Sequence, residues 1–145
     1  MPSRTFFSDP NSHFDAVLAN AAQAAYAAAS TLTNNSAGFD RTAQNTTSGK
    51  HYSGAILGGQ TGAVTGAPTS FTCTYQLQDS PDNSAWTNFG TALVLTAASD
   101  ADSKSIDLSQ ADRWVRVVLT VAYVAGTTPT LFATSNLHLV HDKSR

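Results

Sequence analysis

The sequence has 145 residues with a net charge of −2, and 12% of its residues are charged. A chain of that length fits one domain that buries roughly two-thirds of its unfolded surface. The weak negative charge and the scattered basic residues argue against binding to nucleic acid or to an anionic membrane. No stretch approaches the ~18 apolar residues of a membrane span, and the first residues lack a signal peptide, so we expect synthesis in a cytoplasm.

Residues 1–30 are expected to form an N-terminal arm before a domain over residues 31–145. Three phenylalanines stand in the arm among turn-forming residues, without a clear period: Phe6, Phe7 and Phe14. Residues 15–30 are mostly Ala, and Asp15 is placed to cap a helix. The same residues could instead lie extended against another subunit. A short Ala-rich helix and an extended segment are therefore both open.

After residue 31, short apolar segments alternate with turn-forming residues, which indicates seven or eight strands. They are expected, in chain order, at 38–43, 51–58, 70–79, next to Trp86, and at about 91–97, 104–108, 113–125 and 130–141. The glycines from Gly58 to Gly66 mark a flexible loop, and Gly126 to Pro129 mark a hairpin between the last two strands. The pattern predicts an all-β fold, an antiparallel β-sandwich of the jelly-roll-like kind.

Four segments alternate apolar and polar residues with a period of two, most clearly from Phe71 to Gln78. Successive side chains of a strand point to opposite faces, so the apolar set of each segment is expected to face one core. The predicted core residues all have odd numbers: Phe71, Cys73, Tyr75, Leu77, Leu93, Leu95, Val115, Val117, Leu119, Val121, Leu137 and Leu139.

No set of residues converges on catalysis, a cofactor or a metal, so an enzyme is not expected. The single cysteine, Cys73, shares the core side of its strand and is interpreted as a buried apolar residue. Asp79, Asp82 and Asn83 stand close together, but they lack the order of a calcium-binding loop and are interpreted as turn formers. The four histidines show no spacing that favours a shared metal.

Two features indicate contacts with other protein chains. Trp114, Val118 and Val124 share the even-numbered face of the strand over 113–125, which is too apolar for an open solvent face. We expect the N-terminal segment or a neighbouring subunit to cover part of it. The aromatic residues of the arm are the second feature. The predicted protein-interface residues are Phe6, Phe7, Phe14, Trp114 and Val118.

One passage is more specific than its composition. Its first part reads Tyr75-Gln76-Leu77-Gln78-Asp79-Ser80, with Asp82 and Trp86 after the turn. Its second part reads Ile106-Asp107-Leu108 and then Arg113-Trp114-Val115-Arg116-Val117. This order, within residues 38–141, resembles small head proteins of tailed bacteriophages, the jelly-roll-like cement or decoration proteins that coat phage capsids.

The resemblance implies a non-enzymatic structural protein on the capsid surface of a virion, made in the cytoplasm of the host bacterium. It implies that the chain decorates and stabilises the capsid by binding the lattice of the major capsid protein. It also implies binding to itself, as a homodimer or a homotrimer. No cofactor, nucleic acid or membrane is among the implied partners.

Discoidin-like carbohydrate-binding sandwiches have similar Asp-Ser…Trp and Arg-aromatic-Val-Arg patterns. The alternative function is therefore a carbohydrate-binding module on a virion or cell surface, with Trp86 and Trp114 as a platform for stacking sugars. Carbohydrate binding predicts an exposed aromatic pair over a concave face. Capsid decoration predicts buried tryptophans.

Overall fold

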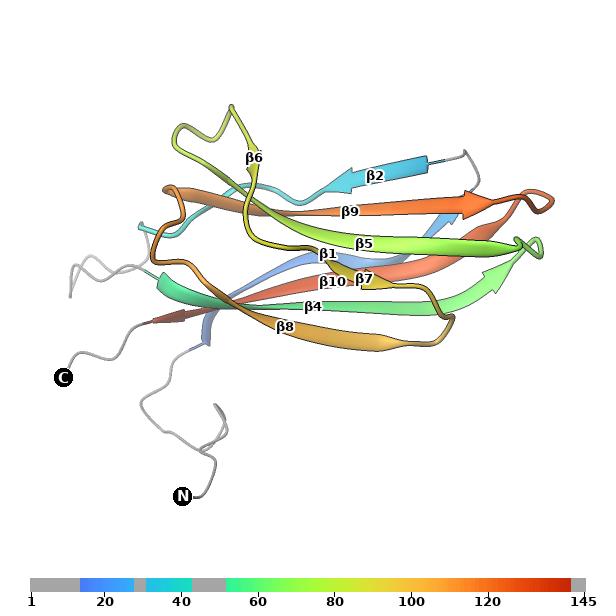
Figure 1. Cartoon of the computed structure of the whole chain (residues 1–145). Coiled ribbons are helices and arrows are strands. Elements are labelled where there is room, and N and C mark those ends of the chain that lie inside the picture. The colour runs from blue at the N-terminus through green and yellow to red at the C-terminus, as the bar shows by residue number, and fades with distance from the viewer. Residues whose placement is uncertain (1–13, 28–30, 43–51, 142–145) are drawn as a thin grey trace, which may run out of the picture.

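The computed structural model describes residues 14–27, 31–42 and 52–141. Within these ranges there are ten strands, and no helix is long and apolar enough to cross a membrane. The strands are β1 (Phe14–Ala27), β2 (Thr31–Asn35), β3 (Phe39–Asp40), β4 (Tyr52–Thr65), β5 (Ser70–Ser80), β6 (Thr87–Asn88), β7 (Leu93–Leu95), β8 (Ala101–Asp107), β9 (Trp114–Val124) and β10 (Thr130–His141). They form two antiparallel sheets that face each other (Figure 1), which confirms the predicted all-β sandwich.

The strand order is that of a jelly roll. Sheet A has the order β1-β10-β4-β8, and sheet B has the order β2-β9-β5-β6, with β3 beside β9 and β7 beside β5. The pairs are nested: β1 with β10, β2 with β9, β4 with β8, and β5 with β6 and β7. The first strand thus pairs with the last and the second with the last but one, as in a long hairpin rolled into two sheets.

The predicted hairpin between the last two strands is wrong. β9 lies in sheet B and β10 in sheet A, so residues 125–129 carry the chain from one sheet to the other. Ala125 and Gly126 have positive φ values of 56° and 99°, which produce the sharp reversal. The connection from β4 to β5 makes the same crossing beside it, and the Thr127 amide donates to the Gly66 carbonyl over 2.8 Å.

The predicted flexible loop from Gly58 to Gly66 is also wrong for most of its length. These residues continue strand β4, which runs to Thr65 between β10 and β8. A Cβ atom on Gly59 would lie 2.5 Å from the Tyr75 ring, and one on Gly58 would lie 2.3 Å from the Asn136 Oδ1. The two glycines therefore leave room for side chains on either side of the strand.

Residues 14–27 are extended, so the short helix considered for the N-terminal segment is not found there. They form β1, which pairs along β10 from Phe14 opposite Val140 to Ala27 opposite Thr130. The hydrogen-bonded ladder with β10 outweighs the helix preference of Ala. The partner of this extended segment is a strand of the same chain, so the sandwich includes residues before position 31.

All twelve residues predicted for the core are buried between the sheets. Cys73 has no exposed surface, and burial raises the pKa of its thiol to about 11, so its interpretation as an apolar core residue is confirmed. Strand β4 and the segment after β8 add core residues that the alternation did not reveal, among them Tyr52, Leu57 and Leu108.

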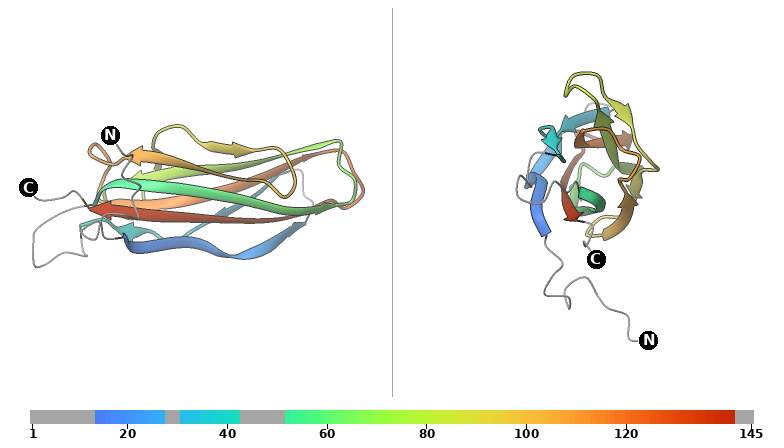
Figure 2. Two further views of the ribbon diagram at one scale, coloured as in Figure 1. Left: turned by 90° about the horizontal axis from the view of Figure 1, so that it is seen from below. Right: turned by 90° about the vertical axis from the view of Figure 1, so that its left-hand side faces the viewer.

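The two ends of the sandwich differ. At one end lie the two sheet-to-sheet connections, where the Thr65 and Thr130 hydroxyls are 2.6 Å apart. At the other end, β1 begins and β10 ends side by side, with Phe14 opposite Val140 (Figure 1). The long strands run between these two ends (Figure 2). The chain therefore enters and leaves the jelly roll at one end.

Candidate interaction surfaces

Residues of the passage that resembles phage head proteins meet at one end of sheet B. Gln78 on β5 pairs in register with Arg116 on β9, and the Arg116 guanidinium donates to the Gln78 Oε1 over 2.7 and 2.9 Å. The same guanidinium lies 4.4 Å from the centre of the Trp86 ring, at cation–π distance. Gln78 also donates to the Asn88 Oδ1 on β6 over 2.9 Å. The contacts fix Trp86 and β6 against the sheet.

Two aspartates of the same passage accept hydrogen bonds from backbone amides near the end of β5. The Asp82 carboxylate accepts from the amides of Ala85 and Ser84 over 2.8 and 2.9 Å, which lowers the pKa of its carboxyl. Asp79 is buried and accepts from the Asp112 amide over 2.9 Å. Asp82 is thus a turn former as predicted, whereas that interpretation is wrong for Asp79, which lies in β5 and binds the segment before β9.

An arginine–aspartate pair joins β3 to the start of β9. The Arg113 guanidinium donates to the Asp40 Oδ2 over 2.9 and 2.5 Å, and the Thr42 hydroxyl donates to the Asp40 Oδ1 over 2.7 Å. Asp40 is 8% exposed, whereas the Arg113 side chain is 56% exposed. Mainly because Arg113 donates to it, the pKa of Asp40 falls from 3.8 to about 2.

We expect the Asp40–Arg113 pair to make the protein acid-sensitive. A carboxyl whose pKa is lower in the folded state stabilises the fold above its unfolded pKa, and that stabilisation is lost as pH falls from about 4 to about 2. The loss should be about 1–2 kcal/mol, since solvent screens the half-exposed arginine. Urea unfolding at neutral pH and near pH 2 measures it. Asp40→Asn should flatten this part of the pH profile, and an unchanged profile would show that Asp40 is not responsible.

Four of the predicted interface residues belong to the end of the sandwich where β1 begins or to the residues before it, and the structure describes only some of them. Phe6 and Phe7 are outside the described residues, and Phe14 is the first residue of β1. Trp114 opens β9 and is half-buried, with the Arg113 guanidinium 5.5 Å from its ring centre. The structure thus brings Phe14 and Trp114 to the same end of the sandwich, on different sheets (Figure 1).

The even-numbered face of β9 is covered over only part of its length. Val118 is 9% exposed, whereas Val124, six residues further along the strand, is 58% exposed. Asn35 of β2 pairs in register with Val118, at the sheet edge rather than over its face. Whether Trp114 and Val118 contact another chain stays a prediction.

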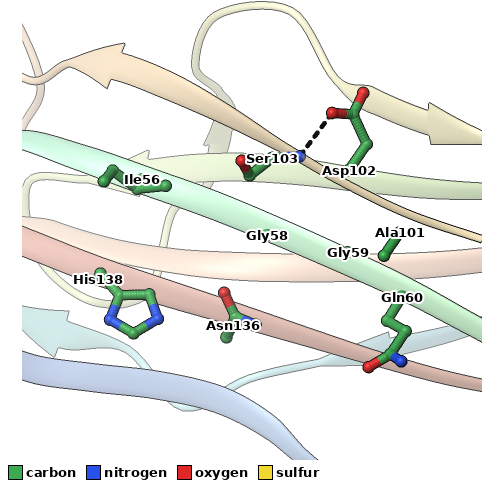
Figure 3. A pocket seen from close by; sticks show the side chains of 9 residues that line it. All are labelled: Ile56, Gly58, Gly59, Gln60, Ala101, Asp102, Ser103, Asn136 and His138. Atoms are coloured by element: carbon green, nitrogen blue, oxygen red, sulfur yellow. Dashed lines mark hydrogen bonds between the residues drawn. The ribbon is translucent and has the colours of Figure 1, made fainter. Parts of the chain in front are cut away.

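An open concavity of about 520 Å³ lies on the outer face of sheet A (Figure 3). Its lining comes from β4, β8 and β10: Ile56, Gly58, Gly59, Gln60, Ala101, Asp102, Ser103, Asn136 and His138. Gly58 pairs in register with both Ser103 and Asn136, so small and neutral residues form the middle of the concavity. None of these lining residues is a tryptophan, tyrosine or phenylalanine. This surface was not predicted, because the part of β4 from Gly58 onward was interpreted as a loop.

The topology places the chain among jelly-roll β-sandwiches. Side chains of the passage that resembles phage head proteins stabilise one end of the sandwich. The structure is similar to the crystal structure of PBSX exported protein XepA, a phage-derived protein, with a TM-score of 0.55 and 14% sequence identity. The alignment covers 90% of this chain and 39% of that chain, so this chain spans about two-fifths of the length of XepA. At this identity the likeness shows the fold. Comparison with protein-family models and with curated proteins gives no match.

Proposed function

We propose that this chain is a structural protein of a bacteriophage particle, without enzymatic activity, that decorates and stabilises the capsid. It binds the lattice of the major capsid protein and further copies of itself at the capsid surface. The observation that supports the proposal most is the jelly-roll topology, which is similar to that of a phage-derived protein. The passage that resembles phage head proteins points to the same class.

The polar residues of this passage make hydrogen bonds within the protein, which supports a structural role. Arg116 and Gln78 bind each other across β5 and β9, and Asp82 orders a turn. These contacts stiffen one end of the sandwich, next to the place where β1 begins and β10 ends. A rigid end with two chain segments leaving it suits attachment to another protein surface, because little conformational entropy is lost there on binding.

Attachment to a lattice does not need a strong single contact. A capsid repeats the same surface many times, so modest contacts from each copy of a decorating protein add up around the symmetry axes. Only 12% of the residues are charged, which reduces repulsion between neighbouring copies at high density. Both properties favour a surface protein present in many copies.

Carbohydrate binding is the second candidate, and the concavity on sheet A is the observation that favours it. Asn136 and Ser103 offer hydrogen bonds there, and Ile56 offers apolar surface. The predicted stacking platform does not lie there, since Trp86 carries the Arg116 guanidinium on its ring and Trp114 lies near Arg113. Both tryptophans are half-buried, so the buried tryptophans expected for capsid decoration are not found either. We prefer capsid decoration because of the fold likeness to a phage-derived protein.

Purified particles test the proposal. We expect the chain in intact virions at a copy number comparable to that of the major capsid protein, and we expect it to stay with the heads when heads and tails are separated. Quantitative mass spectrometry of the two fractions gives the stoichiometry. Recovery with the tails would contradict capsid decoration and keep a structural role in the virion, whereas absence from particles would contradict both. Binding of the purified chain to a glycan array, lost in Asn136→Ala, would favour the second candidate.

A further inference from the structure

Strand β1 is the longest of the outer strands of the two sheets in the described fold. It is the outer strand of sheet A, and β10 is its one neighbour in the strand order. An outer strand presents a row of backbone N–H and C=O groups without ladder partners, which is a template for another strand. With 14 residues, β1 offers several such groups along its outer side. We call this side the β1 edge.

The other sheet edges carry the features with which proteins block pairing. β8, at the opposite edge of sheet A, contains Asp102, Lys104 and Asp107 among its seven residues. The edge strands of sheet B are short, with five residues in β2, two in β6 and three in β7. Short edge strands and edge charges are the usual protection against edge-to-edge contact.

The β1 edge has less of this protection: Asp15 is its one charged residue, and its register with β10 shifts between Phe14 and Ala16 and between Asn20 and Ala24. From Ala16 to Ala27 the strand contains no charged residue and no proline. Two copies of this uncharged stretch can meet antiparallel without repulsion between like charges.

We propose that the β1 edge pairs antiparallel with the β1 edge of a second copy of this chain. The two copies of sheet A then form one continuous sheet of eight strands, in the order β8-β4-β10-β1-β1-β10-β4-β8. A two-fold axis perpendicular to the sheet relates the copies, since antiparallel pairing of identical strands with matching faces requires it. This interface does not depend on attachment to a capsid.

The pairing has a geometric consequence for the concavity. A two-fold axis perpendicular to the sheet keeps the outer faces of both copies on the same side. The two concavities, each centred on Gly58 and Asn136, then open in the same direction. The ends at which the chains enter and leave point in opposite directions, because the two β1 strands are antiparallel.

Charge substitutions on the two edges of sheet A test the proposal in the full-length protein. The wild type is expected to have twice the 15.2 kDa mass of one chain in light scattering coupled to size exclusion. Ala25→Lys, opposite the exposed Phe132 in register, should weaken the dimer at least about tenfold. Ser105→Lys on β8 is the matched control and should leave the dimer unchanged, because that edge is not part of the interface.

Gln23→Lys is a second variant for the case that Ala25→Lys fails to fold, since it exchanges one long polar side chain for another. Circular dichroism with a wild-type β spectrum establishes that a variant is folded. A monomeric wild type at all concentrations would overturn the proposal and would mean that other residues of the same chain cover the β1 edge. A dimer that tolerates the β1 lysines as well as it tolerates Ser105→Lys would also overturn it and would place the interface on another surface.

Discussion

Leu119→Asp is expected to prevent folding. Leu119 has no exposed surface and lies in the middle of β9, in register with Tyr75 on β5 and Asn34 on β2. The substitution removes a fully packed side chain, which costs about 2–5 kcal/mol, and adds a carboxylate without a charge partner in an apolar core. The sum is comparable to the whole stability of a domain, about 5–15 kcal/mol. Circular dichroism should show no cooperative unfolding transition.

Val124→Asp is the matched control for this prediction. Val124 lies on the same strand, but it is 58% exposed, so a new carboxylate there stays hydrated. Its effect on the free energy of unfolding should stay within about 0.5 kcal/mol. If Leu119→Asp unfolded cooperatively at the urea concentration of the control, the register of β9 would be wrong.

The core was predictable because the sheets have one buried face each. In β5, burial alternates residue by residue from Phe71 to Asp79, so the period of two in the sequence maps directly onto the structure. The same logic failed for β4. Gly58 and Gly59 have no side chains with which to show an alternation, and the reason for each glycine is a side chain on another strand. Glycine inside a strand often marks a place where another group approaches closely.

The connection after β9 shows a second limit of local sequence signals. Gly126 and Pro129 do mark a chain reversal, and the structure has one there. The reversal, however, does not say which sheet the next strand joins, because that depends on pairing with distant strands such as β1 and β4. The Ala-rich β1 is a similar case, in which pairing with β10 decides between helix and strand.

For the contacts at the end of sheet B, the sequence indicated which residues are polar but not which distant residues pair. Asp82 was expected in a turn, and its bonds to the Ser84 and Ala85 amides are local. The pair of Asp40 and Arg113 spans 73 residues and depends on β3 lying beside β9. A single sequence contains no signal for such a contact, since its geometry arises from the sheet register.

A comparison of two glycines in β4 tests how tightly the sandwich is packed. Gly59→Ala should destabilise the protein by about 1–3 kcal/mol, because the new methyl group would lie 2.5 Å from the ring of Tyr75. The ring has no exposed surface and its hydroxyl donates to the Gln60 carbonyl over 2.9 Å, so it has little room to move. Urea denaturation measures the change in the free energy of unfolding.

Gly54→Ala is the control in the same strand. Its methyl group would lie 3.8 Å from the nearest atom, the Ile106 carbonyl oxygen, which is an ordinary contact. The change should stabilise the protein by up to about 1 kcal/mol, because alanine has less conformational entropy to lose than glycine. Tyr75→Leu removes the ring that Gly59→Ala would strike, so the two substitutions together should cost at least about 0.5 kcal/mol less than the sum of their separate effects. Strict additivity would show that Tyr75 is not what the Gly59 position accommodates, and that another contact makes glycine necessary there.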